Sequence, residues 1–516
     1  MAGNGALAQD AVAVATCAVA AVPAGLRWLR VAQREHYLAD AASRYALRWW
    51  TVSPANLVLL AVGAAGLVLA SRWALAALGT AFVVTVGPVG LGLRGRTSPL
   101  AWTRRLRTLA AVWAGLQGGA IAAGVLLGAG AVVTAAAALA VPALVDAACV
   151  LTAPLEHRFA RRHVARASRR LARVGPRVVA ITGSYGKTTT KGYVTHLVSA
   201  TLAAVASPAS FNNRAGLART VNEHLADGTE VLVAEMGTYG PGEIAELCRW
   251  LKPEISVITA VGPVHLERFG TEDAIVEAKS EILHMASTVI LGTDDSRLAA
   301  VADRSELQGK TVWRVSVDRR DADVCVEDVG DSLRVWVKGE KLTDVSVDAR
   351  PLNVGCALAV ALALGVAPGA IVTRLPTLPS APHRLEPAPT SSGRCLVLDD
   401  TYNSNPAGAR AALDAMVRMA PPGGRRVVVT PGMVELGARQ KQENTRFAAE
   451  AGRVATDLVF VGRTNRRALL RGAYESGVQD RTVIVDNRDQ AVAWVRDHLG
   501  EGDVALFEND LPDHYP

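Results

Sequence analysis

A glycine-rich segment, TGSYGKTTTK at residues 182–191, has the residue types and spacing of a phosphate-binding loop. It follows an apolar, strand-like run at 177–182 and precedes a helical pattern that extends to residue 200. In this order of elements, backbone N–H groups of the turn and of the helix N-terminus face phosphate oxygens. We therefore expect a nucleotide to bind here. The expected contacts are Gly183, Ser184, Tyr185, Gly186, Lys187, Thr188 and Thr189, with Lys187 at the β- and γ-phosphates and Thr188 at Mg²⁺.

The loop is shorter than the common eight-residue form, because Ile181 stands where an early glycine is usual. A glycine-rich structural turn is the alternative interpretation. Such a turn would explain neither Lys187 nor the helix that follows, so nucleotide binding is the prediction.

Three further polar residues have positions that suit chemistry beside this loop. VLVAEMG places Glu235 at a strand end, and ISVITAVGPVH places His265 after another strand. The carboxyl ends of parallel strands form the ligand-binding edge of an open α/β sheet. Lys279 lies in the helical run EDAIVEAKSEIL. A helix cap, a packed loop histidine and a solvated helix lysine are the alternatives for these three residues.

Five sequence blocks together form a recognisable series. TGSYGKTTTK is followed by SFNNRAGLARTVN (210–222), EMGTYGPGEI (235–244) and VHLERFGTEDAIVEAKSEIL (264–283), and then by LDDTYNSNP (398–406) with MVELG (433–437). With these blocks, residues 177–510 resemble the Mur ligase family, which forms amide bonds with ATP. Within that family, the resemblance is to the members that add D-alanyl-D-alanine to a muramoyl tripeptide.

The resemblance implies roles for individual residues. Thr188, Glu235 and His265 would hold Mg²⁺, and a carbamylated Lys279 would supply an anionic oxygen to a second Mg²⁺. With Lys187, the residues Glu235, His265 and Lys279 would form the catalytic set. The remaining implied residues are Asn353, Arg384 and Asp400 at the nucleotide, and Asn212, Asn213, Asn403 and Asn405 at the substrates.

The chain departs from the family pattern at several positions. Leu352 and Cys356 flank Asn353, at positions where a His and an Asn are usual. Pro431 replaces the first residue of a usual Gly-Asp-Met, which here lacks its acid. The usual basic tail block reads FENDLPD, which suggests a cationic amine substrate bound by Glu508 and Asp510.

The implied reaction is a carboxylate–amine ligation. A substrate carboxylate attacks the γ-phosphate to give an acyl phosphate, and an amine then displaces phosphate. No enzyme nucleophile is needed. The fold expected for this chemistry is α/β, with a P-loop ATPase domain at 157–375 and a Rossmann-like domain at 376–516, because apolar strands alternate with helical patterns in both.

Residues 1–156 are expected to be a transmembrane helical region in place of the family's UDP-binding domain. Apolar runs at 54–71, 74–93, 109–130 and 131–151 predict four spans, and 11–26 is a candidate fifth. Arginines gather at 27–53, 94–107 and 158–173, which predicts a multi-pass protein of the cell membrane with cytosolic catalytic domains. Asp146 within the last run is either functional or a carboxylate that faces the bundle or snorkels to the membrane interface.

Charge and cysteine content limit the remaining classes. Residues 1–174 carry eighteen Arg and five acids, a balance of +13, so the rest carries −6 of the net +7. A mildly acidic soluble part argues against nucleic-acid partners. The six scattered Cys predict reduced thiols.

The expected partners are membrane lipid and a carboxylate and an amine substrate, with a lipid-linked substrate as one alternative. A cell-wall precursor and a specialised peptide or polyamide product are both open as the product. An ATPase coupled to the membrane helices and a degenerate membrane scaffold are the alternatives from other classes.

Overall fold

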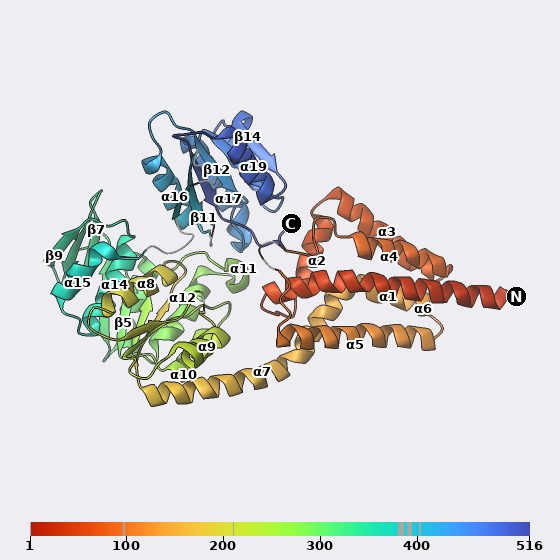
Figure 1. Ribbon diagram of the computed structural model, residues 1–516, viewed down its shortest axis with the longest axis horizontal. Coiled ribbons are helices and arrows are strands. Elements are labelled where there is room, and N and C mark those ends of the chain that lie inside the picture. Colours follow the sequence, from red (N-terminus) through yellow and green to blue (C-terminus); the bar gives the residue numbers. More distant parts are fainter. Residues whose placement is uncertain are drawn as a thin grey trace.

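The computed structural model describes residues 2–95, 97, 99–209, 211–379, 386–389, 395–401 and 404–516. An N-terminal helical region is followed by a central domain built on a nine-stranded sheet and a C-terminal domain built on a six-stranded sheet (Figure 1). Arg384 and Asn403, predicted to contact nucleotide and substrate, lie outside the described residues.

The helical region contains two helices that are long and apolar enough to cross a membrane, or up to four candidate spans if each of two bent helix pairs counts as one. The first is within α1, which includes the predicted run 11–26, and the second is α5. The helices are α1 (Ala2–Arg34), α2 (Ala41–Thr51), α3 (Pro54–Ala70), η1 (Ala74–Ala76), α4 (Ala77–Val86), α5 (Arg104–Leu126), α6 (Gly130–Leu139) and α7 (Val141–Val174).

Two of the expected spans are interrupted. The run 74–93 was predicted as one helix, but α4 is only ten residues long and ends at Gly87, in front of Pro88. Proline has no N–H to donate and disfavours helical geometry in the residue before it, so the helix cannot continue. The run 131–151 is divided between α6 and α7, which meet at an angle of 73°. Pro142 lies in the first turn of α7, a position that favours a new helix start.

The bundle has a small-residue core and an apolar outer surface. Buried alanines and the aromatic rings of Trp28, Tyr45 and Trp49 pack between the helices. Asp146 accepts hydrogen bonds from the backbone N–H groups of Ala42 (3.0 Å) and Ser43 (2.9 Å), at the N-terminus of α2. This contact matches the bundle-facing alternative for Asp146.

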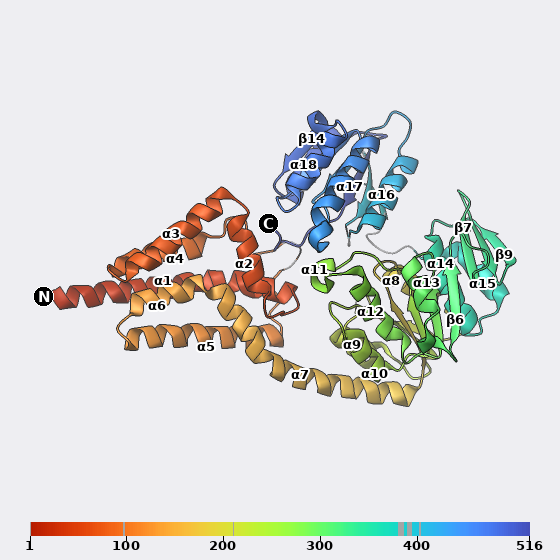
Figure 2. The ribbon, with the colours of Figure 1, turned by 180° about the vertical axis from the view of Figure 1, so that it is seen from behind.

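The arginine-rich segments lie at the end of the bundle that faces the catalytic domains. Figure 2 shows the turns after α3 and α5 at the opposite end, together with the N-terminus. This is the common side that the arginine distribution predicts for 27–53, 94–107 and 158–173.

Helix α7 belongs to two regions. Its first half packs in the bundle, whereas Ala167 and Leu171 near its end are buried in the core of the central domain with Leu217 and Val221 of α9. The expected boundary at residue 156 therefore falls inside a continuous helix, which joins the two regions without a loop (Figure 1).

The central sheet has the order β2-β3-β1-β4-β5-β6-β7-β8-β9, parallel up to β7 and antiparallel beyond it. Helices α8 and α14 pack on one face, and α7, α9, α10, α12 and α13 pack on the other. The strands are β1 (Arg177–Thr182), β2 (Ala204–Ala206), β3 (Val231–Glu235), β4 (Ile255–Ile258), β5 (Thr288–Gly292), β6 (Thr311–Ser316), β7 (Val324–Asp328), β8 (Leu333–Val337) and β9 (Glu340–Val345). The helices are α8 (Lys187–Val198), α9 (Arg214–His224), α10 (Glu243–Leu251), α11 (Leu266–Phe269), α12 (Glu272–Ser280), η2 (Glu281–Leu283), α13 (Ser296–Ala302), η3 (Ser305–Leu307), α14 (Pro351–Ala363), α15 (Pro368–Arg374) and η4 (Leu375–Thr377).

The C-terminal sheet has the order β10-β11-β15-β12-β13-β14, parallel except for β10. The mixed α/β fold of both catalytic domains agrees with the expectation. The elements are β10 (Glu386–Pro389), β11 (Leu396–Asp400), α16 (Pro406–Met419), β12 (Arg426–Thr430), η5 (Gly437–Arg439), α17 (Gln440–Val454), β13 (Asp457–Val461), α18 (Arg466–Glu475), η6 (Gln479–Arg481), β14 (Thr482–Val485), α19 (Arg488–His498) and β15 (Val504–Glu508).

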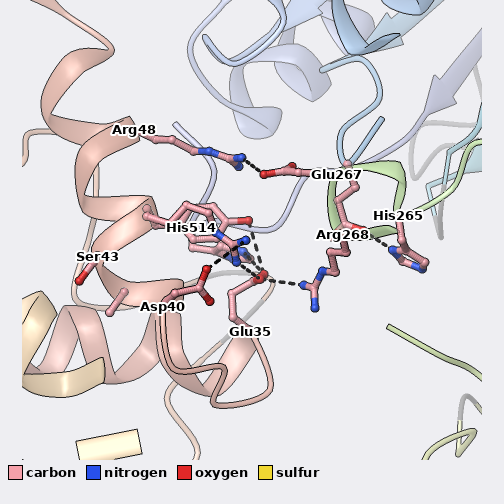
Figure 3. Close-up of polar contacts among 12 residues, drawn as sticks. Glu35, Asp40, Ser43, Arg48, His265, Glu267, Arg268 and His514 are labelled. Atoms are coloured by element: carbon pink, nitrogen blue, oxygen red, sulfur yellow. Dashed lines mark hydrogen bonds and ion pairs between the residues drawn. The ribbon is translucent and has the colours of Figure 1, made fainter. Parts of the chain in front are cut away.

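The segment after β15 leaves the C-terminal domain and packs against the helical region. Tyr515 is buried in the core of the bundle. The indole N–H of Trp49 donates to the carbonyl of His514 (2.9 Å), and the His514 ring, itself buried, contacts the Glu35 carboxylate (2.9 Å; Figure 3). The tail thus connects the last domain of the chain to the first region.

Candidate active site

The phosphate-binding loop lies at the carboxyl edge of the central sheet. Its strand, β1, is flanked by β3 and β4, so the loop is enclosed on both sides. Gly183 has a φ of +154°, and a Cβ there would lie 2.1 Å from the Thr259 hydroxyl oxygen. The Ser184 N–H donates to the Ala260 carbonyl (2.7 Å). These contacts with the segment after β4 hold the turn in shape.

Gly186 ends the loop in a left-handed conformation, with φ of +77°. A Cβ at this position would lie 2.3 Å from the side-chain oxygen of Asn353, so α14 packs directly on the loop. The Asn353 side chain is buried, and its amide nitrogen has no hydrogen-bond acceptor among the described residues. A buried amide N–H group that lacks an acceptor beside a nucleotide loop fits the predicted contact of Asn353 with adenine.

Two lysines lie close to each other at the loop. The Lys187 amine folds back onto the loop and donates to the Gly183 carbonyl (2.7 Å). Thr188 and Thr189 follow in the first turn of α8 and are half-buried. Lys279 is buried on α12, and burial, with the charge of Lys187 nearby, lowers its pKa well below the ordinary value. It is therefore not the solvated helix lysine of the alternative interpretation.

Glu235 ends β3 beside the loop and is buried. Its carboxylate pairs with the Lys191 amine (3.1 Å) and accepts a hydrogen bond from the Asn212 side chain (3.2 Å). The Lys191 amine also donates to the Ala209 carbonyl (2.5 Å). Glu235 is thus a partnered carboxylate at the sheet edge and does not cap a helix.

Two of the predicted substrate residues are helix caps. The side-chain oxygen of Asn213 accepts from the Gly216 N–H (2.9 Å) at the start of α9, and that of Asn405 accepts from the Gly408 N–H (2.8 Å) at the start of α16. Such contacts satisfy N–H groups that have no partner within the helix. In this arrangement, Asn212 is the member of the asparagine pair that faces the site.

His265 begins α11 and is oriented by the other catalytic domain. Its Nδ1 contacts the Glu435 carboxylate, which comes from the MVELG block of the C-terminal domain. A carboxylate that accepts the Nδ1–H of a histidine leaves Nε2 as the free lone pair, which is the usual arrangement at metal sites. The Tyr239 ring packs edge-on against the same imidazole, with the ring centres 4.9 Å apart.

The side chains at this edge supply some of the oxygen ligands that Mg²⁺ needs. Mg²⁺ prefers oxygen ligands, and the Glu235 carboxylate and the Thr188 hydroxyl supply them next to the loop. Within the described part of the chain, no three His, Cys, Asp or Glu residues form a ready metal cluster. Additional oxygen ligands from nucleotide phosphates, water or a carbamylated Lys279 would therefore complete the site.

The acidic tail residues are engaged within the C-terminal domain. Glu508 is fully buried beside Asp400 at the carboxyl edge of the sheet. It accepts from the hydroxyl groups of Ser404 and of Thr430 (2.7 Å), and burial raises its pKa to about 7. Asp510 pairs with Arg488 (2.6 Å). The hypothesis that both acids bind a cationic amine is therefore not supported by their contacts.

Comparison with known proteins agrees with this geometry. Residues 181–361 match the Mur ligase middle domain, and residues 383–508 match the Mur ligase, glutamate ligase domain. The UDP-N-acetylmuramoyl-tripeptide–D-alanyl-D-alanine ligase of Mycobacterium bovis is 33% identical over 364 residues, which cover 65% of this chain and 70% of that protein. The chain belongs to the Mur ligase family.

Members of this family are ATP-dependent, ADP-forming amide ligases. The corresponding ligase of Bacillus subtilis is 28% identical over 66% of this chain and 74% of its own length. The crystal structure of MurF from Acinetobacter baumannii superposes with a TM-score of 0.58 at 25% identity, covering 67% of this chain and 76% of that one. Neither matched domain range includes the helical region.

Several residues of this Mur ligase site had no role assigned from sequence. Lys191 lies one helical turn after Lys187, and this spacing could have predicted that both amines face the same edge. Glu435 lies within a recognised block, but its contact with His265 spans 170 residues. Nothing in the local sequence signals such a pairing between domains.

The Gly186–Asn353 contact leads to a test of nucleotide binding. We expect Gly186→Ala to weaken ATP binding at least about tenfold, because the new methyl group displaces Asn353 and the loop. The matched control is Gly228→Ala, which has a similar φ of +87° but no atom within 4 Å of the added methyl group. Titration of a fluorescent ATP analogue measures both. Equal affinities in the two variants would contradict the assigned role of this packing.

Proposed function

We propose that this Mur ligase joins a carboxylate to an amine at the cytosolic face of a membrane, and that its product is a cell-wall precursor. The observation that supports this most is the gathering of Lys187, Glu235 and buried Lys279 at one sheet edge. The relatives named above add D-alanyl-D-alanine to a muramoyl tripeptide. A specialised peptide or polyamide product is the second candidate, because the helical region has no counterpart in the matched domains.

The proposed chemistry proceeds in two displacements. An oxygen of the substrate carboxylate forms a bond to the γ-phosphorus of ATP while the bond to the bridging oxygen breaks, and ADP leaves. The amine nitrogen then bonds to the acyl carbon, the tetrahedral intermediate expels phosphate, and the nitrogen loses a proton. Lys187 would neutralise charge on the transferred phosphoryl group, and the loop N–H groups would hold the phosphates in position.

Thr188, Glu235, His265 and a carbamylated Lys279 are the residues that would hold Mg²⁺, which supplies charge neutralisation when bound. The Asn212 amide and the Lys191 amine hold the Glu235 carboxylate in place. For the nucleotide, Asn353 is proposed at the adenine and Asp400 at the ribose. Asn212 would orient the acyl group.

The membrane location is proposed from the surface of the helical region. Several large apolar side chains of this region are largely exposed, among them Leu7, Val19, Val58, Val68, Leu126 and Leu127. So many large, largely exposed apolar side chains in one region are unusual on a protein surrounded by water. Together with the helices long enough to cross a bilayer, it favours embedding of the region in lipid.

Ligase chemistry is separated from the alternatives by one assay. We expect purified protein to release ADP and phosphate only when UDP-N-acetylmuramoyl-tripeptide and D-alanyl-D-alanine are both present with ATP. Hydrolysis without them would favour an ATPase coupled to the helices. ATP binding without turnover, with this pair and with a panel of other acidic peptides and amines, would favour a scaffold.

Carbamylation of Lys279 makes activity depend on CO₂. An ordinary lysine is almost fully protonated at pH 7, whereas the lowered pKa leaves Lys279 with more of the neutral amine that reacts with CO₂. We expect CO₂-free buffer to lower kcat at least about tenfold and bicarbonate to restore it. Lys279→Ala should lose activity and its response to bicarbonate. Lys310→Ala, a change at a partly exposed lysine of another segment, is the control. Full activity without CO₂ would contradict the proposal.

The proposed topology predicts different accessibility at two exposed arginines. Arg72 lies in the turn after α3, and Arg162 lies on α7 next to the central domain. In intact cells, we expect a membrane-impermeant maleimide to label Arg72→Cys, and to label Arg162→Cys only after permeabilisation. The six native cysteines are buried, so the background is low. The reverse labelling pattern would be incompatible with the proposed orientation.

A further inference from the structure

We propose that Arg34, the last residue of α1, and His36, on the loop between α1 and α2, form part of the acyl-substrate site and bind a second carboxylate of that substrate. The inference rests on the proposed ligase function and extends it. It assigns to the helical region a direct part in substrate recognition, in addition to any role in anchoring the protein.

The position of this loop follows from a row of aromatic contacts. The Tyr239 ring lies 4.9 Å from the ring of His265 and 5.2 Å from the ring of His36. In the proposed function His265 would hold Mg²⁺, so the substrate carboxylate would meet the γ-phosphate near its imidazole. The nucleotide loop occupies one side of that point, so the remainder of the acyl substrate must extend away from it. Figure 3 shows Glu35 of the helical region beside Arg268 of the central domain, on the segment that begins at His265.

The loop is fixed by contacts of Gln33, just before Arg34, and of buried Glu35, between Arg34 and His36. The Glu35 carboxylate contacts the buried His514 ring (2.9 Å) and the Arg268 guanidinium (3.0 Å) of the central domain. The Gln33 side chain donates to the Ala101 carbonyl (2.6 Å) and accepts from its N–H (2.9 Å). Arg34 and His36 are exposed on the two sides of buried Glu35. Their position is therefore set by the packing of three regions.

The backbone of the loop has an unusual conformation. His36 and Tyr37 have φ values of +57° and +63°, in the left-handed region that residues with a side chain rarely adopt. Non-glycine residues with such angles gather at ligand sites, where a particular side-chain direction is needed. Here the conformation carries the His36 ring toward Tyr239.

The charge on the loop favours an anionic ligand. Neighbouring arginines are paired within the protein: Arg48 with Glu267, and Arg268 with Glu35. For Arg34, no ion pair is found among the described residues, and its side chain is exposed. A guanidinium binds a carboxylate through two parallel hydrogen bonds. Its charge is thus available to a ligand.

The spacing limits where the second carboxylate lies in the substrate. Two ring contacts separate His265 from His36. An extended peptide advances roughly 3.3 Å per residue, so this path corresponds to about three residues. The carboxylate bound by Arg34 and His36 would thus lie within about three residues of the reacting one.

The test uses the full-length protein in detergent, with UDP-N-acetylmuramoyl-tripeptide, D-alanyl-D-alanine and ATP. The variants are Arg34→Gln, which keeps side-chain length, and His36→Asn, because asparagine tolerates the left-handed conformation. Each should raise the KM for the tripeptide about tenfold, with the KM for ATP unchanged and kcat within about twofold. Arg72→Gln, at the far end of the helical region, is the matched control and should change nothing.

A tripeptide with its second carboxylate amidated identifies the group that is bound. For wild type, the KM for this analogue should be about tenfold higher than the KM for the unmodified tripeptide. For Arg34→Gln, the two KM values should be equal. Unchanged KM values in both variants would overturn the proposal. It would also be overturned if amidation had no effect on wild type while Arg34→Gln still raised the KM, because the loop would then bind another group, such as a diphosphate.

Failure of the proposed substrate pair is distinguishable from failure of this inference. If wild type does not turn over the pair, a panel of acidic and neutral acyl peptides is tested for amine-dependent ADP release. A preference for peptides with two carboxylates, lost in Arg34→Gln, supports the inference although the substrate pair was wrong. A preference for neutral acyl peptides would overturn it.

Discussion

The relative placement of the three regions depends on one buried carboxylate, that of Glu35. An unpaired carboxylate in this environment would cost several kcal/mol, so Glu35 requires cationic or hydrogen-bonding partners. Its closest partners are in two other parts of the chain: Arg268 of the central domain and His514 of the tail (Figure 3). The helical region can bury this residue only when α11 and the tail are both packed against it.

Helix α7 also constrains how the helical region and the central domain lie relative to each other. Helix α7 passes from the bundle into the core of the central domain without a break, and its turn at Ala167 and Leu171 is buried against α9. Because no loop separates the two regions, α7, which includes Pro154, limits the distance between the bundle and the central sheet. The contacts at α11 and the packing of α7 together hold the central domain at two points.

Much of the catalytic fold follows from local sequence. The apolar strands and the glycine-rich turn at 183–186 predicted the parallel strands and loop, because buried parallel strands require continuous apolar runs. The antiparallel strands β7 to β9 were not predicted, although Lys338 and Gly339 have the two positive φ values of a tight hairpin turn. In the helical region, apolar length alone predicted spans, and the effects of Pro88 and Pro142 on helix ends were missed.

The site itself was predictable only where its residues follow strands. Glu235 and the loop are adjacent because β1 and β3 are neighbours, which a strand pattern can indicate. The caps made by Asn213 and Asn405 could have been foreseen, since each is an Asn directly before a helical pattern, and Pro406 occupies the first helical position after Asn405. The contacts of Glu435 with His265 and of His514 with Glu35 join residues far apart in the sequence, and only the packed domains create them.

Through these long-range contacts, the C-terminal domain and its tail bind the other two regions at two points close to α11. Glu435 orients the imidazole of His265, and seventy-odd residues later the tail enters the bundle beside Glu35, whose partner Arg268 lies one turn after His265. A shift of the C-terminal domain would therefore disturb the orientation of His265 and the partners of Glu35 together. Both contacts involve α11 or the residue before it. The position of this short helix therefore links the packing of all three regions to the orientation of His265.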